Sequence, residues 1–208
     1  MNDKKTCCVI GNLYKEIPWH YKKVSNWCEF HYLNVIDKEL EKLIQQGYDY
    51  FITDATYGVG FDASHVILNL KDYYFDHVQF EIAVPYAQQH KKFPKRARKF
   101  YKEFAQYADF VSVFQEKKTR NARLNCNKNM IDRSDLVVFF WDEKDTGLIH
   151  KLKLYAQEKG KEIKIYNLWA ILHEAEGFVA RTTSSLKQFL KENSPISSTV
   201  SGRCTSFN

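Results

Sequence analysis

Residues 136–141 read Leu-Val-Val-Phe-Phe-Trp, an apolar run with no polar interruption. A strand that is apolar on both of its faces is typical of a parallel sheet covered by helices on each side. Comparable apolar runs recur along the chain, and the spacing between them leaves room for a helix. The strands that this pattern predicts are 6–10, 48–53, 78–84, 109–114, 136–141 and 162–166.

The segments between these runs carry the apolar periodicity of amphipathic helices. One apolar face is expected from Leu33, Ile36, Leu40, Leu43 and Ile44, a second from Ala63, Val66, Ile67, Leu70 and Tyr74, and a third from Ala97, Phe100, Tyr101, Phe104 and Ala108. A weaker helix is predicted over 119–133, and another around 148–155 that ends before Gly160. The alternation predicts an α/β fold, a Rossmann-like three-layer sandwich with a mostly parallel sheet of about six strands.

Length and composition bound the number of domains. A chain of 208 residues with 44% hydrophobic residues is expected to bury one core, which we place over residues 1–166. Residues 167–208 then form a C-terminal extension, helical over 184–191 and flexible in the Ser/Thr-rich stretch from 194 onward.

The cysteines and the N-terminal segment indicate a cytoplasmic protein that does not enter a membrane. The five cysteines are odd in number and form no CxxC pair, so we expect neither disulfides nor zinc. The first residues do not resemble a secretory signal, and no run reaches the roughly 20 apolar residues of a membrane span. The seven histidines show no metal-ligand spacing, so we expect no metal, no cofactor and no metal-dependent catalysis.

Ligands of open parallel sheets bind beyond the carboxyl ends of the strands, so the loops there are the first places to look. Gly11 and Asn12 follow the first predicted strand and suit either a ligand contact or an ordinary turn. The second strand leads through Thr53, Asp54 and Gly58 into a helix, where small residues and free amides can cradle a phosphate. Asp54 would repel that phosphate, so the loop alone is a weak signal.

Two further loops follow the third and fifth strands. Pro85 and Tyr86 come after the third, where the Tyr86 ring could stack on a base. Asp142, Thr146 and Gly147 come after the fifth and lead into another helix, with Thr146 as a cap or ligand donor. A purely structural role explains each of these residues equally well.

The formal net charge of +6 attracts anions, and one segment concentrates positive charge. Its basic residues are Lys91, Lys92, Lys95, Arg96, Arg98, Lys99 and Lys102. Such a cluster, with aromatic residues nearby, could bind nucleic-acid phosphates. It could also be the solvated face of a helix whose other side enters the core.

Several segments, taken in order, resemble the YpsA-like branch of the SLOG superfamily, whose other members include DprA-type DNA-binding proteins and LOG-type nucleotide phosphoribohydrolases. The resemblance covers roughly residues 5–166. The segments that carry it are Cys7-Cys8-Val9-Ile10-Gly11, Gly58-Val59, Ala83-Val84-Pro85-Tyr86, Tyr107-Ala108-Asp109-Phe110-Val111, Met130-Ile131-Asp132-Arg133-Ser134-Asp135 and Tyr155-Ala156 followed by Gly160. Their order and spacing are more specific than any one of them.

The departures from the family pattern fall on the loops. Relatives typically carry Thr-Gly-His-Arg at 10–13, where this chain has Ile-Gly-Asn-Leu. They carry Ser-Gly-Gly-Ala-x-Gly-Val-Asp at 53–60, where this chain has Thr-Asp-Ala-Thr-Tyr-Gly-Val-Gly. A family Gly-Gly-Thr becomes Gly-Leu-Ile at 147–149, and an Arg-Asn pair retains only Asn127. The resemblance therefore implies a retained scaffold with an altered site.

These observations favour a degenerate SLOG-like domain that binds a nucleotide-derived ligand without catalysis, as a sensor or a sequestering protein. The positions expected at the ligand are Gly11, Asn12, Thr53, Asp54, Gly58, Pro85, Tyr86, Asn127, Asp142, Thr146 and Gly147. One alternative is an N-glycosidic hydrolase related to LOG enzymes, with Asp54 or Asp142 as the working carboxylate. Another is DprA-like nucleic-acid binding through the cluster at 91–102, and a homo-oligomer is compatible with each.

Overall fold

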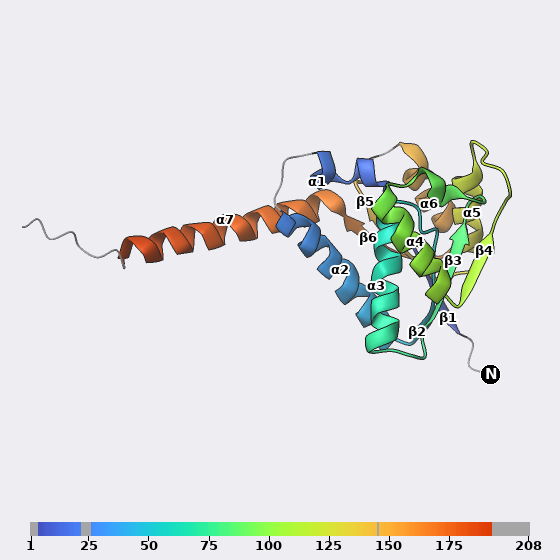
Figure 1. Cartoon of the computed structure of the whole chain (residues 1–208), viewed down its shortest axis with the longest axis horizontal. Helices are drawn as coiled ribbons and strands as arrows, with labels where there is room; N and C mark the ends of the chain where they lie inside the picture. Colours follow the sequence, from blue (N-terminus) through green and yellow to red (C-terminus); the bar gives the residue numbers. More distant parts are fainter. Residues whose placement is uncertain (1–3, 22–25, 145, 193–208) are drawn as a thin grey trace, which may run out of the picture.

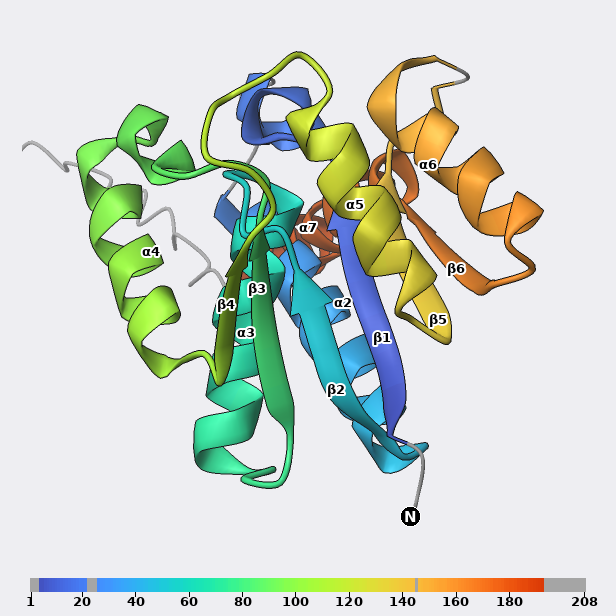
Figure 2. The same cartoon turned by 90° about the vertical axis from the view of Figure 1, so that its right-hand side faces the viewer.

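Parallel strands form a single six-stranded sheet in the order β4-β3-β2-β1-β5-β6 (Figures 1 and 2). The computed structural model describes residues 4–21, 26–144 and 146–192. Its strands are β1 (Lys5–Gly11), β2 (Tyr48–Thr53), β3 (Gln79–Val84), β4 (Phe110–Val113), β5 (Leu136–Trp141) and β6 (Glu162–Asn167). The predicted strands are thus confirmed, those at 48–53 and 136–141 with the same bounds.

Helices cover both faces of the sheet, as the prediction of a three-layer Rossmann-like sandwich requires. The helices are α1 (Pro18–Tyr21), α2 (Asn26–Gln45), α3 (Val59–Tyr73), α4 (Lys95–Tyr107), α5 (Ala122–Asp132), α6 (Gly147–Glu158) and α7 (Leu168–Glu192), with 3₁₀ turns η1 (Tyr14–Glu16) and η2 (Gln89–Lys92). One face packs against α2, α3, α4 and the first half of α7, and the other against α5 and α6 (Figure 2).

The alternation of side chains along β1 explains why this strand is apolar throughout. Cys7 and Val9 enter the core on the α2 and α3 side, whereas Cys8 and Ile10 enter the core beneath α5 and α6. Burial raises the pKa of the Cys8 thiol to about 12, so the thiol stays protonated at neutral pH. Both cysteines therefore act as small packing residues.

The C-terminal helix begins earlier than the sequence pattern predicts. The expected helix at 184–191 is the end of α7, which starts at Leu168 directly after β6 and extends beyond the body of the domain (Figure 1). Asn167 caps its start, because the side-chain oxygen accepts hydrogen bonds from the amides of Trp169 and Ala170. The first turns of α7 bury Leu172 against α2. The stretch from 194 onward, predicted to be flexible, lies outside the described residues.

Candidate functional site

A cavity of about 300 Å³ opens where the strand order reverses, at the carboxyl ends of β1 and β5. In doubly wound sheets this reversal separates the loops of two neighbouring strands and leaves a crevice for a ligand. The cavity is lined by Asn12, Leu13, Glu16, Arg123, Trp141, Asp142, Lys144, Thr146, Gly147, Leu148 and Ile149. We call it the switch-point cavity.

The N-terminus of α6 forms one wall of the switch-point cavity. Thr146 is the N-cap residue, and its side chain makes no capping hydrogen bond to the first-turn amides. Gly147 follows with φ +93°, a left-handed conformation that favours glycine. Uncapped amides and the positive end of the helix dipole make such a terminus favourable for an anion.

Charges of both signs surround the cavity. Lys144 Nζ lies 2.7 Å from Asp142 Oδ2, and the Lys144 side chain is 62% exposed at the mouth. Glu16 accepts a hydrogen bond from the Leu13 amide at 2.9 Å, which fixes the loop after β1. The Asn12 side chain accepts one from the Asp142 amide at 3.3 Å and thereby ties the two loops together.

Arg123 lines the cavity and also binds a buried carboxylate, Asp54, that lies beneath it. From α5 the guanidinium donates to the Gly11 carbonyl at 2.8 Å and to Asp54 Oδ2 at 2.8 Å. Asn127, one turn further along α5, also donates to Asp54 Oδ2 at 3.1 Å. The Thr56 amide binds the other carboxylate oxygen at 2.9 Å. We call Asp54, Arg123 and Asn127 the buried ion-pair cluster.

The electrostatics of this cluster keep Asp54 ionised. Burial raises the pKa of the Asp54 carboxyl, but the Arg123 charge and the hydrogen bonds from Arg123, Thr56 and Asn127 outweigh it and hold that pKa below its usual value. Asp54 is 2% exposed and its two oxygens already have internal partners. It is therefore a structural anion that orients Arg123.

The loop after β2 is shaped around Asp54. A Cβ at position 60 would lie 2.3 Å from Asp54 Oδ1, so the carboxylate needs glycine there. Ala55 adopts φ +42°, a region that strains a residue with a Cβ. Gly58 has φ +133°, and a Cβ there would meet the backbone of Asn12 and Tyr14 at 2.5 Å. The glycine expected to approach a ligand instead brings two loops of the protein together.

The structure brings some of the predicted site residues together and separates others. Four line the switch-point cavity: Asn12, Asp142, Thr146 and Gly147. Three lie beneath it, in contact with Arg123 or one another: Gly11, Asp54 and Asn127. The remaining predicted residues, Thr53, Gly58, Pro85 and Tyr86, do not line it. Thr53 is fully buried and pairs with Ser64 at 2.7 Å, whereas the Tyr86 ring lies 5.9 Å from Lys118 Nζ.

Sequence reasoning missed the two cations of the cavity, Arg123 and Lys144. Arg123 brings a guanidinium to the loop after β1 from α5, where it donates to the Gly11 carbonyl. A usable signal was the spacing of four residues between Arg123 and Asn127, which places both on one side of the helix. Lys144 lies in the loop before α6, where a cation beside a helix N-terminus favours anions.

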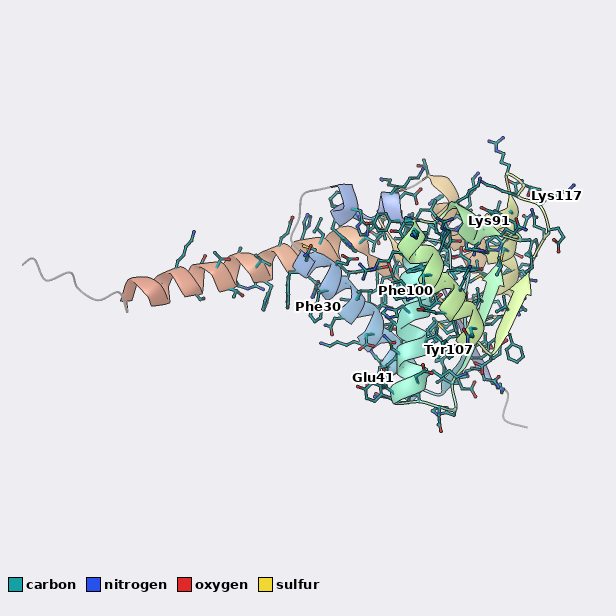
Figure 3. The ribbon with its side chains drawn as sticks, viewed as in Figure 1. Phe30, Glu41, Lys91, Phe100, Tyr107 and Lys117 are labelled. Carbon is teal, nitrogen blue, oxygen red and sulfur yellow. The ribbon has the colours of Figure 1, made fainter. Side chains whose placement is uncertain are left out.

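The basic cluster at the start of α4 forms a second, open hollow of about 580 Å³. It is lined by His90, Lys91, Lys95, Arg98, Lys99 and Lys102. Arg96 belongs elsewhere, because its guanidinium lies 5.8 Å from the Phe100 ring and lines a different, aromatic cavity. Figure 3 labels Phe100 on α4 and Lys91, which belongs to η2 just before that helix.

Within the described part of the chain, no three His, Cys, Asp or Glu side chains come close enough together to hold a metal ion. Over the same residues, no helix has the length and apolar character needed to cross a membrane.

The fold and the cavity define an α/β domain of the doubly wound class with a ligand-sized crevice at its switch point. The family model described as the YspA SLOG family matches residues 28–175, and the chain belongs to this family. Its similar curated relatives include UPF0398 proteins of Halalkalibacterium halodurans (26% identical over 53% of this chain and 59% of the relative) and Shouchella clausii (27%, over 56% and 64%). A UPF0398 protein of Brevibacillus brevis is 24% identical over 68% of this chain and 79% of its own length. The chain thus spans less than two thirds of the length of the first two relatives.

Proposed function

We propose that the protein binds a nucleotide-derived ligand in the switch-point cavity and acts as a sensor or sequestering protein without catalysis. The observation that carries this proposal is the cavity itself, where Arg123, Lys144 and the uncapped N-terminus of α6 converge. These groups suit the phosphate of the ligand, because charge-assisted donors and a helix N-terminus both favour an anion.

The rest of the cavity suits a small polar molecule with an apolar part. Its volume of about 300 Å³ lies at the small end of ligand pockets, which run to roughly 1,000 Å³. Trp141 and Leu148 supply apolar wall, and the Asn12 and Glu16 side chains supply hydrogen-bonding groups. This combination fits a mononucleotide or a comparably small derivative.

Two features favour binding over hydrolysis. Asp54 is held ionised by Arg123, so it has no proton to give, and it does not line the cavity. Asp142 is 8% exposed and faces Lys144. A LOG-like hydrolase would release free base from nucleoside monophosphates, and we expect none after prolonged incubation.

The test is isothermal titration against a panel of nucleoside mono- and diphosphates, cyclic nucleotides and ADP-ribose derivatives. Replacing Lys144 by Gln removes a charge at the cavity mouth and should weaken binding about ten- to a hundredfold, the value of a charge-assisted hydrogen bond. The matched control is Lys151→Gln, the same change on an exposed residue of α6 that does not line the cavity. The proposal fails if no compound of the panel binds, or if both variants bind equally well.

The hollow lined by the basic cluster at the start of α4 supports a second candidate function, binding of single-stranded nucleic acid. Its cations lie together on an exposed surface, and such binding weakens steeply with salt. Arg98→Glu, within the hollow, should reduce affinity for an oligonucleotide by more than Arg96→Glu, which places the same charge change on the other side of α4. Equal effects of the two variants, or affinity indifferent to salt, would dismiss this candidate.

A further inference from the structure

The edge strand β4 exposes more apolar surface than an edge strand usually does. Phe110, Val111, Val113 and Phe114 are 48%, 45%, 48% and 43% exposed. In Figure 1 β4 is the outermost strand of the sheet, and among the residues that the structure describes only β3 pairs with it. Apolar residues gathered in this way on a surface mark an interaction site.

The edge lacks the features by which proteins block strand pairing. Residues 110–114 contain no proline and no charged residue. The Phe114 amide donates to the Val84 carbonyl at 2.8 Å, toward β3. Because backbone groups alternate in direction along a strand, those of Ser112 and Phe110 also face β3, and those of Val111 and Val113 face the open edge. A further strand could pair there without disturbing the pairing with β3.

The sequence of this strand identifies the partner. Residues 110–114 read Phe-Val-Ser-Val-Phe, which is the same in both directions about Ser112. Two antiparallel copies related by a two-fold axis at Ser112 would place each Phe110 opposite the other copy's Phe114, and each Val111 opposite Val113. Cross-strand pairs of aromatic and of β-branched residues stabilise antiparallel strands.

We propose that β4 is a homodimerisation strand, which pairs antiparallel with β4 of a second copy about a two-fold axis at Ser112 and joins the two sheets into one. The interface is isologous, because the same five residues serve both subunits. An unrelated strand would use the same edge, but the palindrome makes the segment complementary to itself in a single register.

The neighbouring side chains hold β4 ready for this pairing. The Ser112 hydroxyl donates to Glu81 Oε1 at 2.6 Å, and Arg133 holds the same carboxylate through two hydrogen bonds of 2.8 and 2.9 Å. The Phe110 ring stacks on Tyr50 at 6.0 Å, so one of the aromatic residues is already oriented. Tyr107, 59% exposed at the end of α4, lies beside the start of the strand (Figure 3). Because these side chains are already held in the single subunit, dimerisation would cost little further side-chain entropy.

The experiment is sedimentation equilibrium of the full chain and of two double variants, at concentrations up to roughly 100 μM, which detects Kd values in the micromolar range. The wild type should dimerise. V111K/V113K puts lysine opposite lysine at two places across the axis and should weaken the dimer at least about tenfold. V111K/V113E puts lysine opposite glutamate at both places and should restore it, with affinity that falls as salt rises.

The two variants control for one another, because both replace the same exposed valines by charged residues. Circular dichroism and thermal unfolding of each should match the wild-type monomer. A wild type that stays monomeric, a Lys/Lys variant that dimerises as well as the wild type, or a Lys/Glu variant that fails to recover would each overturn the proposal.

Discussion

Replacing Arg123 by Met should destabilise the domain strongly at neutral pH. Arg123 Nε lies 2.8 Å from Asp54 Oδ2, and the two side chains are 16% and 2% exposed. Methionine keeps much of the length of the side chain but leaves the Asp54 charge buried without its cation. Removing one partner of a buried ion pair costs about 3–5 kcal/mol. For a chain of this size the melting temperature should fall by roughly 6–20 °C.

The same substitution should reverse the pH dependence that Asp54 contributes. In the wild type the folded pKa of Asp54 lies below the unfolded value of about 3.9, so its contribution is present above that pH and lost as pH falls through the folded pKa. Without Arg123, burial dominates and the folded pKa lies above the unfolded one. Stability then falls as pH rises from about 4 toward neutrality, and the deficit against the wild type grows over that interval.

Urea unfolding followed by tryptophan fluorescence at pH 4.5 and pH 7 measures both effects. The control is Arg120→Met, the same change at an exposed arginine just before α5. Adding Asp54→Asn to Arg123→Met removes the stranded charge and should restore much of the loss at pH 7. A loss below about 1 kcal/mol at pH 7, within the range of an exposed pair, would refute the reasoning, as would a loss equal at both pH values.

Three further predictions concern groups around the site. Burial raises the pKa of the half-buried Asp62 to about 8, so its ionisation disfavours folding increasingly between pH 4 and 8. Asp62→Asn should therefore raise the free energy of unfolding by about 1–2 kcal/mol at pH 8 and by little at pH 4, as measured by urea unfolding. Ala55→Gly should relieve the strain of φ +42° and raise the melting temperature by roughly 2–4 °C, and a decrease would argue against that conformation. Gly11→Ala should lower the free energy of unfolding by about 2 kcal/mol or more, because the added Cβ would lie 2.4 Å from the Phe140 carbonyl oxygen. Gly177→Ala, whose Cβ would have its nearest neighbour at 3.5 Å, should instead raise the melting temperature.

The sheet could be predicted from the sequence because burial on both faces leaves a compositional trace. Every side chain of β5 is buried, and its run of six apolar residues matches a strand that is covered on both faces. The start of α7 left a weaker trace, since β6 passes directly into the helix and only the Asn167 cap marks the boundary. The same pattern implied burial at β4, where Phe110, Val111 and Val113 are apolar yet exposed. Composition reports which residues avoid water, but not whether an intramolecular or an intermolecular surface covers them.

The candidate site was harder to predict, because its charges come from elements distant in sequence. Asn12, Asp142, Thr146 and Gly147 could be found from the rule that loops after parallel strands meet. Arg123 could not be found in that way, because it reaches Gly11 across 112 positions from the side of a helix. Local pattern describes which face of α5 is apolar, whereas the reach of a long flexible arginine depends on how that helix lies over the sheet.

The altered loop after β2 is best understood as one coupled change. The family pattern has two glycines at 54 and 55 and an acid at 60; here the acid stands at 54 and the glycine at 60. A Cβ at position 60 would collide with Asp54 Oδ1, so these two positions depend on each other. Arg123 then neutralises the Asp54 carboxylate, which in turn holds the guanidinium at the wall of the cavity. Because neither β2 nor the loop after it lines the switch-point cavity, a ligand there would contact the loops after β1 and β5 and the start of α6. Selectivity should therefore respond to substitutions at Lys144 and Thr146 and be insensitive to those at Thr53, an asymmetry that ligand titrations of these variants would reveal.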